Sequence, residues 1–346
     1  MPLNRQTINN INNFIAMRRP PFAICALTLL LIACNDSPVM PEDTSLQEGV
    51  YCPERRIDYI RTDDNLEIWL WDANHLIALA DDDMCGGYEE KCWFEYNGDR
   101  LISMQSTLRG FPYEAAYSYS DGMLSTVSAF SSGTEVLDLT FSHDTDRQLS
   151  AVHIDIAPEL LDVLSSLLGG WGDESLTTIA TFDSVSASLA FSWSGNNISQ
   201  QVLTADLEGA VSMGMIKEIV DLESQLGSYA FLAELIPDST MLPIGVSLKD
   251  TTQFTFDNHP NPFYGLLYTP EAYVLCKNNI VSATHRGAAT LTIVLQSPMG
   301  NFSIPLPYSL PERTDTYKYT YDEYGYPFEV YQNGTSFKTY SYSNQL

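Results

Sequence analysis

The chain has 346 residues, of which 45% are hydrophobic and 12% aromatic, with 17 basic and 44 acidic side chains. So many aromatic residues argue against a disordered acidic chain. A formal net charge of −27 argues against binding to nucleic acid or to anionic lipid head groups. The length suits one large domain or two small ones, and no nucleic-acid partner is expected.

The first 33 residues have the parts of a secretory signal. The basic pair Arg18-Arg19 precedes an apolar run over residues 22–32, which is too short for a good membrane span. The cysteine that follows, Cys34, resembles the lipidated cysteine of bacterial lipoprotein signals. We therefore predict a signal peptide over residues 1–33, with the true start at Met17, and a lipid anchor such as palmitate on Cys34.

A flexible tether is predicted over residues 34–49, which are polar and contain two prolines. Residues 1–33 hold three of the 17 basic residues and no acid, so the remaining chain has 14 basic against 44 acidic residues. This balance suits a body that the tether holds away from the membrane. We expect that body to be a single β-rich domain over residues 50–346.

Alternating aromatic and polar residues recur on both sides of short turn sequences. Asn-Gly and Asp-Gly pairs between such segments are strong hairpin signals, because both residues tolerate positive φ. Alternation with a period of two places the aromatic side chains on one face of a strand. We predict consecutive hairpins with turns at residues 97–98, 121–122, 143–147, 195–197 and 323–325.

Two segments instead carry apolar residues at helical spacing. The first, over residues 158–168, begins with Pro158 and Glu159, which suit the first turn of a helix. The second runs over about residues 213–236. Both need burial against the sheet, since each buried leucine contributes about 1.5–3 kcal/mol. The predicted fold is therefore mainly β (α+β): a long, curled antiparallel β-meander with two helical insertions packed on one face.

Four cysteines remain once Cys25 is removed with the signal and Cys34 is lipidated, and an exported compartment permits disulfides. A local bridge between Cys85 and Cys92 across a hairpin is the first choice, with Cys52–Cys276 as the remaining pair. Four cysteines allow three connectivities, and the sequence does not choose among them. No metal site is expected here, because the spacing is not Cys-x-x-Cys and no histidine pair accompanies it.

Three segments of the C-terminal half resemble elements of a known group of proteins. Residues 319–327 and residues 254–263, an aromatic strand ending in Asp-Asn-x-x-Asn-Pro-Phe, resemble the tyrosine–aspartate β-hairpin units of uncharacterised bacterial surface and outer-membrane lipoproteins. Residues 276–280, Cys-Lys-Asn-Asn-Ile, resemble the short element that follows such a strand. The resemblance implies an exported lipoprotein with a β-rich body, a domain of unknown function, and no catalytic residues to carry over.

The chain is not expected to be an enzyme. The five histidines form neither His-x-His nor His-Glu-x-x-His, and the nucleophile-elbow and phosphate-loop motifs are absent. A Ser-His-Asp site assembled from distant residues stays open, because such sites are recognised by geometry. No cofactor is expected. The acidic groups at residues 81–83 and 143–146 are candidates for calcium, against the simpler interpretation of solvated loops.

The expected function is non-catalytic binding or envelope assembly by an outer-membrane lipoprotein, periplasmic or surface-exposed, with an unknown protein or glycan partner. The alternative is a carrier of a hydrophobic ligand, an acyl chain or lipid, in the hollow of a curved sheet. Met213, Met215, Leu226 and Phe231 are then the candidate pocket residues, although they also suit a simple core. A third hypothesis is a hydrolase that acts on glycans or peptides.

Overall fold

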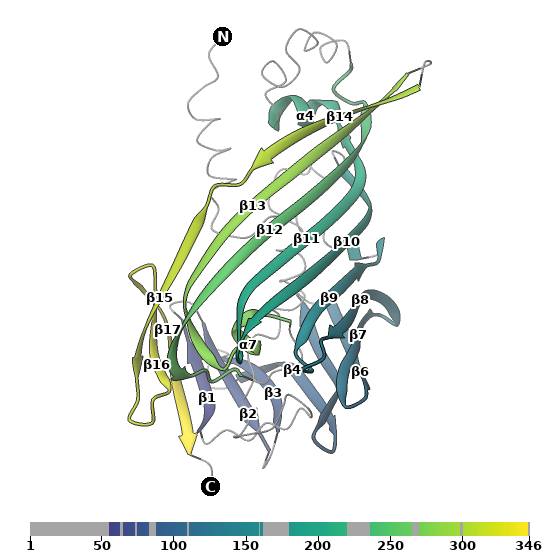
Figure 1. The fold of residues 1–346 in the computed structure, drawn as a ribbon. Coiled ribbons are helices and arrows are strands. Elements are labelled where there is room, and N and C mark those ends of the chain that lie inside the picture. The colour runs from purple at the N-terminus through teal and green to yellow at the C-terminus, as the bar shows by residue number, and fades with distance from the viewer. Residues whose placement is uncertain are drawn as a thin grey trace.

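The computed structural model describes ten stretches of the chain: residues 55–62, 65–72, 75–82, 88–108, 111–158, 160–161, 180–219, 236–264, 270–297 and 300–344. These residues form one antiparallel sheet and two short helices (Figure 1). The strands are β1 (Arg55–Arg61), β2 (Leu66–Trp71), β3 (Leu76–Asp82), β4 (Tyr88–Asn97), β5 (Arg100–Leu108), β6 (Phe111–Ser120), β7 (Met123–Ser131), β8 (Thr134–His143), β9 (Leu149–Ile156), β10 (Ala180–Ser194), β11 (Asn197–Ser212), β12 (Met241–Pro260), β13 (Asn278–Ser297), β14 (Gly300–Ser309), β15 (Arg313–Tyr321), β16 (Pro327–Gln332) and β17 (Thr335–Asn344). The helices are α4 (Met213–Ile219) and α7 (Ala272–Leu275).

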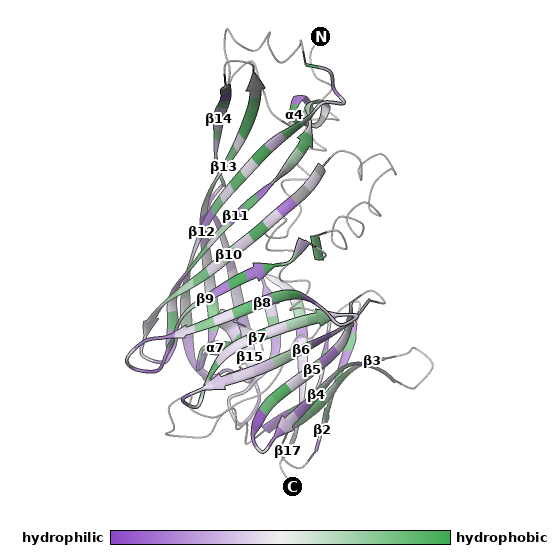
Figure 2. Cartoon of the chain, turned by 90° about the vertical axis from the view of Figure 1, so that its right-hand side faces the viewer, coloured by the Kyte–Doolittle hydropathy of each residue, from purple (hydrophilic) through white to green (hydrophobic). Residues whose placement is uncertain are grey.

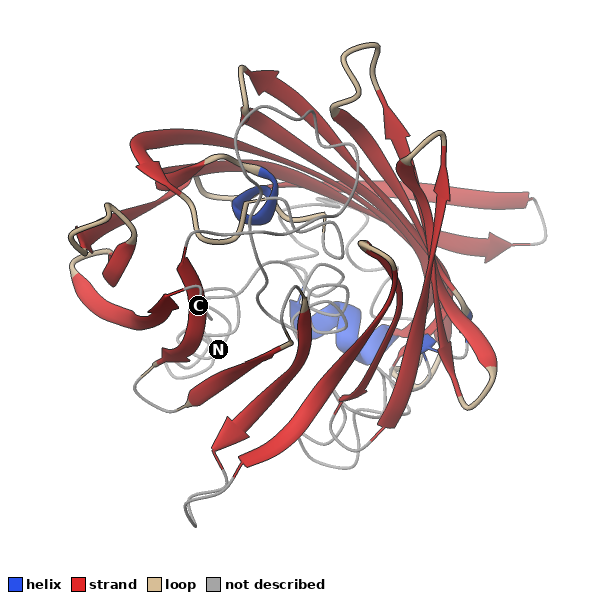
Figure 3. Cartoon of the chain, turned by 90° about the horizontal axis from the view of Figure 1, so that it is seen from below, coloured by secondary structure: helices blue, strands red, loops and turns tan. Residues whose placement is uncertain are grey.

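The sheet closes on itself. Each strand pairs with the next one along the chain, with one exception. Strand β13 pairs with β14 and, further along, with β15, which takes the place that β14 would have in the ring. Strand β17 pairs with β1, so sixteen strands form a closed ring and β14 extends it beside β13 (Figure 3). The expected open, curled α+β sheet is therefore wrong. Closure pairs two edge strands that an open sheet leaves exposed. The pairing joins the two ends of the domain, so no local sequence pattern predicts it.

The two expected helical insertions are also corrected. Helix α4 ends seven residues into the segment predicted over 213–236, and most of the rest lies outside the described residues. In the segment predicted over 158–168, Leu160 and Leu161 are buried in the main core, and the later residues again lie outside. Strand makes up 76% of the structure and helix 5%. Among the described residues, no helix is long and apolar enough to cross a membrane.

The five predicted hairpin turns are confirmed. Strands β4–β5, β6–β7, β8–β9, β10–β11 and β15–β16 are joined at the predicted positions. Gly98 and Gly195 have a φ of 62°, and Asp121 and Gly122 have φ values of 53° and 79°. Glycine and aspartate adopt this left-handed backbone at low cost, which is why these dipeptides mark the turns.

The inner face of the ring is apolar and the outer face of β6–β13 is polar. On β9, Val152 and Ile154 are completely buried inside the ring. His153 lies between them and Asp155 follows Ile154, and both are exposed outside the ring. Serine and threonine dominate the outward positions of β10–β13, as in Ser186, Ser188, Ser192, Thr204, Ser247, Thr251, Thr290 and Thr292. This alternation is that of a sheet with its core inside and water outside.

Four strands are much longer than the others and rise above the closed part of the ring. Strands β10–β13 have 15 to 20 residues, against 6 to 10 elsewhere. Strand β9 pairs with β10 only at Val185–Ala190, so these strands and β14 continue upward as a curved wall (Figure 1). We call residues 180–184, 207–212, 241–249, 288–297 and 300–309 the upper shell. The other residues of the ring form the lower ring.

The connection between β12 and β13 folds into the lower ring. Helix α7 lies inside the ring when the molecule is seen from below (Figure 3). Phe263, Val274, Leu275 and Cys276 of this connection are at most 5% exposed and belong to the main core. The described part of the connection therefore fills the lower ring from within, and we call residues 261–264 and 270–277 the plug.

Candidate ligand-binding site

The inner face of the upper shell is an apolar wall. Leu207, Val246, Leu291 and Leu306 lie opposite one another on four neighbouring strands and face inward. Leu306 is buried, whereas the other three are half-buried. Nearer the top, Ile244, Ile293 and Ile304 repeat this row, and Phe302 is 52% exposed. In Figure 2 these strands carry alternating hydrophobic and hydrophilic bands along their length. The wall thus offers apolar surface that the rest of the protein covers only in part.

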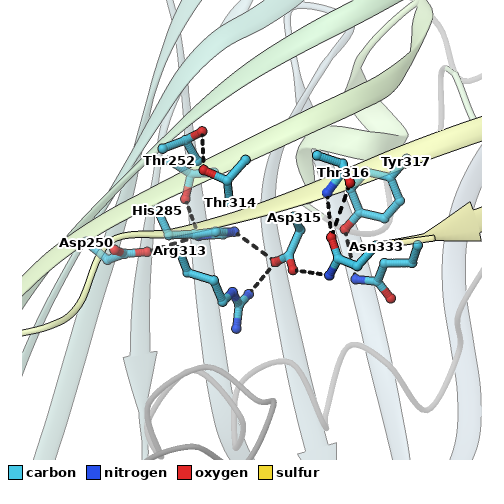
Figure 4. Close-up of polar contacts among 11 residues, drawn as sticks. Asp250, Thr252, His285, Arg313, Thr314, Asp315, Thr316, Tyr317 and Asn333 are labelled. Carbon is cyan, nitrogen blue, oxygen red and sulfur yellow. Dashed lines mark hydrogen bonds and ion pairs between the residues drawn. The ribbon is translucent and has the colours of Figure 1, made fainter. Parts of the chain in front are cut away.

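A polar cluster interrupts the wall at its lower end, where β13 changes partner from β14 to β15. Figure 4 shows Asp250, Thr252, His285, Arg313 and Asp315, which come from β12, β13 and β15. His285 Nδ1 lies 3.0 Å from Thr252 Oγ1 and 3.6 Å from Asp250 Oδ2. On the other side of the imidazole, His285 Nε2 lies 3.7 Å from Asp315 Oδ2.

The two carboxylates of the cluster have different surroundings. The side chain of Asp315 is 9% exposed, and its oxygens contact Arg313 Nη2 at 2.7 Å and accept a hydrogen bond from Asn333 Nδ2 at 3.0 Å. The side chain of Asp250 is 17% exposed and lies beside Gly287, where a Cβ would approach Asp250 Oδ1 to 3.0 Å. Among the described residues, the ionisable side chain beside it is that of His285.

The cluster does not form a nucleophilic site, although Thr252, His285 and Asp315 have the residue types of a triad. Thr252 is only 5% exposed, so its hydroxyl does not reach a substrate. The separation of 3.7 Å between His285 Nε2 and Asp315 Oδ2 is longer than a hydrogen bond. A triad needs both an accessible nucleophile and an oriented base, and this cluster supplies neither.

A second polar network holds the plug in place and explains the motif at residues 257–263. Asn261 is 4% exposed, and its amide donates hydrogen bonds to the carbonyl oxygens of Tyr273 and Cys276. Its side-chain oxygen accepts a bond of 3.0 Å from the backbone N–H of Phe263. The Asp257 carboxylate accepts hydrogen bonds from Asn279 and from the hydroxyl of Tyr321. The Asn261 contacts are structural because they hold the two ends of the plug together, and the Asp257 contacts join β12 to β13 and β15 beside it.

Of the four predicted pocket residues, the structure describes the side chain of Met213. It is 3% exposed and packs in a small core with Ile293 and Leu306 of the wall. Leu226, Phe231 and the side chain of Met215 lie outside the described part of the structure.

The cysteine predictions have mixed outcomes. Cys276 carries a free thiol that accepts a hydrogen bond from the backbone N–H of Ile198 at 3.2 Å, so the expected Cys52–Cys276 bridge is not formed. Burial raises the pKa of this thiol to about 12. Cys34, Cys52 and Cys85 lie outside the described residues. The Cys85–Cys92 bridge and the lipid on Cys34 therefore stay predictions.

The acidic loops do not assemble a metal site in the described ranges, where no three His, Cys, Asp or Glu side chains are grouped to hold an ion. Asp144 Oδ1 instead accepts hydrogen bonds of 2.9 Å from the backbone N–H groups of Asp146 and Gln148. That carboxylate orders the β8–β9 turn. Asp83 lies outside the described residues, so calcium binding at residues 81–83 stays a prediction.

Sequence reasoning missed the polar cluster because no motif connects its members. One signal was present: Leu242, Ile244, Val246 and Leu248 alternate along β12, and Asp250 takes the next inward position of that series. A charged residue in an apolar face is unusual and points to a site. His285, Arg313 and Asp315 join it only through strand pairing.

Comparison with known proteins yields no family assignment. No protein-family model matches the chain, and no curated protein is detectably similar in sequence. Among solved structures, a porin-like protein from Bacteroides uniformis matches with 10% identity, over 84% of this chain and 99% of that chain, at a TM-score of 0.28. At that TM-score the likeness carries no argument about function.

Proposed function

We propose that this protein is a lipid-anchored, non-catalytic binding protein of the bacterial cell envelope, and that the apolar wall of the upper shell holds a hydrophobic ligand such as an acyl chain. The observation that carries the proposal is the contrast between the two faces of β11–β14. Inward positions such as Val246 and Leu291 are apolar and half-buried, whereas the outward Ser247 and Thr292 beside them are polar. A core residue of a closed barrel is fully covered, whereas these two side chains keep part of their surface exposed.

The energy available on the wall is sufficient for a single chain. Each buried CH2 contributes about 0.8 kcal/mol, so a twelve-carbon tail gains about 9 kcal/mol on full burial. Association costs at least about 4 kcal/mol in lost motion. The remainder, about 5 kcal/mol, corresponds to a sub-millimolar dissociation constant.

The anchored, envelope location in this proposal is supported by the sequence. The signal over residues 1–33, the lipidated Cys34 and the tether over residues 34–49 precede the first described strand. The polar outer face of β6–β13 suits a body surrounded by water, because the outward positions of membrane-spanning barrels are apolar. Mass analysis of the protein from a bacterial envelope tests the anchor: we expect an added diacylglycerol and acyl mass that Cys34→Ser removes, and an unmodified mass in the wild type contradicts it.

The binding proposal is tested with the mature chain carrying Cys34→Ser, titrated with a fluorescent single-chain fatty probe. Leu291→Asp places a charge on the wall and is expected to weaken binding at least about tenfold, the cost of burying an unpaired polar group. Thr292→Asp adds the same charge on the outer face of the same strand and is expected to leave binding unchanged. Absence of binding by the wild type, or equal effects of the two variants, overturns the proposal.

A further inference from the structure

We propose that the ligand is an amphiphile with a primary ammonium head group and that Asp250 receives this group. The inference rests on the proposed function, because the wall above Asp250 supplies the site for the tail. Asp250 occupies the inward position directly below Leu248 on β12, and its neighbours across the strands are Leu203 and Gly287. A chain lying along the wall from top to bottom therefore brings its head group to this carboxylate.

Asp250 differs from Asp315 in the number of its hydrogen bonds. Asp315 contacts Arg313 and Asn333 at 3.0 Å or less. Asp250 has no hydrogen bond from any described residue, and its separation of 3.6 Å from His285 is longer than a hydrogen bond. Because its side chain is 17% exposed, a donor carried by a ligand can reach this carboxylate. An ammonium group brings three donors and a full positive charge.

The charges of the cluster favour the same head group. Arg313 is already paired with Asp315 at 2.7 Å, and no described lysine or arginine forms an ion pair with Asp250. An ammonium beside Asp250 makes the second ion pair in a place where apolar neighbours strengthen electrostatic interactions. A carboxylate head group meets repulsion from Asp250 at the same point. An alcohol head group donates a single hydrogen bond and gains no ion pair.

Gly287 allows Leu310 and Asp250 to approach β13 closely. A Cβ at this position would lie 2.8 Å from Leu310 Cδ1 and 3.0 Å from Asp250 Oδ1. The backbone N–H of Leu310 also donates a hydrogen bond of 2.9 Å to the carbonyl oxygen of Gly287. The residue after β14 is therefore held over the glycine, beside the carboxylate, and closes the lower end of the wall on that side.

The test compares three ligands with the same tail, dodecylamine, dodecanol and laurate, on the mature Cys34→Ser chain in buffer with enough salt to screen surface charge. We expect dodecylamine to bind at least about tenfold more tightly than laurate, the range of a hydrogen bond to a charged group. Asp250→Asn, which preserves shape, is expected to remove this preference while dodecanol binding and melting temperature stay close to wild type.

The matched control is Asp206→Asn, which makes the same charge change on the outer face of β11, where Asp206 accepts a hydrogen bond from Ser247 Oγ at 2.6 Å. It is expected to keep the preference for dodecylamine. Tightest binding of laurate, or a preference that survives Asp250→Asn, overturns the ammonium assignment while the proposed function stands. Failure of all three ligands to bind overturns the proposed function itself, and with it this inference.

Discussion

The lower ring and the upper shell are made of the same sheet, yet they use it differently. In the lower ring sixteen strands close, the plug fills the interior, and side chains such as Leu139 and Ile154 are completely buried. In the upper shell β10–β14 continue with two edges that pair with no described strand, and inward side chains such as Val246 and Leu291 stay half-buried. Closure therefore buries side chains completely, whereas the unclosed part of the same sheet keeps apolar surface partly exposed.

The largest effect is expected from the plug, which has no counterpart in the upper shell. Asn261→Ala removes the two hydrogen bonds that the amide donates to the carbonyl oxygens of Tyr273 and Cys276 and the one that it accepts from Phe263, at about 1–3 kcal/mol each. We expect a loss of roughly 3–6 kcal/mol in the free energy of unfolding, measured with urea. Asn301→Ala, on an exposed position of β14, is the control and is expected to be neutral. Equal effects of the two changes contradict a structural role for the plug.

A direct comparison of the two regions replaces one leucine in each. Leu139 is 0% exposed in the lower ring, so Leu139→Ala is expected to cost about 2–5 kcal/mol. Leu291 is half-buried on the wall, so Leu291→Ala is expected to cost less than about 2 kcal/mol. Denaturant titration of both variants measures the difference. A cost at Leu291 as large as at Leu139 means that the wall is an ordinary core.

Two glycines on neighbouring strands extend the comparison: Gly245 lies in the upper shell and Gly287 at its lower border. A Cβ at Gly287 meets Leu310 at 2.8 Å, so Gly287→Ala is expected to destabilise by about 1–2 kcal/mol. At Gly245 the nearest atom is Leu207 O at 4.0 Å, and Gly245→Ala is expected to be neutral or slightly stabilising. Melting temperatures distinguish the two, and a neutral Gly287→Ala shows that Leu310 moves freely.

The smallest effect is expected from alkaline pH and belongs to the lower ring. Burial raises the pKa of Tyr113 and Tyr119 from 10.0 to about 12, although the charge of Arg100 lowers the pKa of Tyr119 in part. Burial also raises the pKa of Cys276, from 9.0 to about 12. The unfolded chain releases these protons first, so stability is complete below pH 9 and falls as the pH rises toward 12. Tyrosinate absorbance in native protein and in urea tests this: coincident titration curves contradict it.

The sequence alone supported part of this picture, and particular residues show where it stopped. The Asn97-Gly98 and Asp121-Gly122 turns were predictable because their backbone preferences are local. The plug motif was visible in Asn261 and its neighbours, but its role was not, because its partners at Tyr273 and Cys276 lie 12 and 15 residues further along the chain. The α+β fold predicted from apolar spacing was wrong, because such spacing does not reveal how a sheet closes.

Strand identity, turn positions and the alternation of apolar and polar faces were determined by the sequence itself, because each depends on residues a few positions apart. Closure of the ring through β1 and β17, burial of the plug, and the meeting of Asp250, His285 and Asp315 were decided only by the tertiary structure. Those contacts join residues 30 to nearly 290 positions apart, from Asp315 to His285 at the near end and from Arg55 to Asn344 at the far end. No local preference encodes a pairing over such separations.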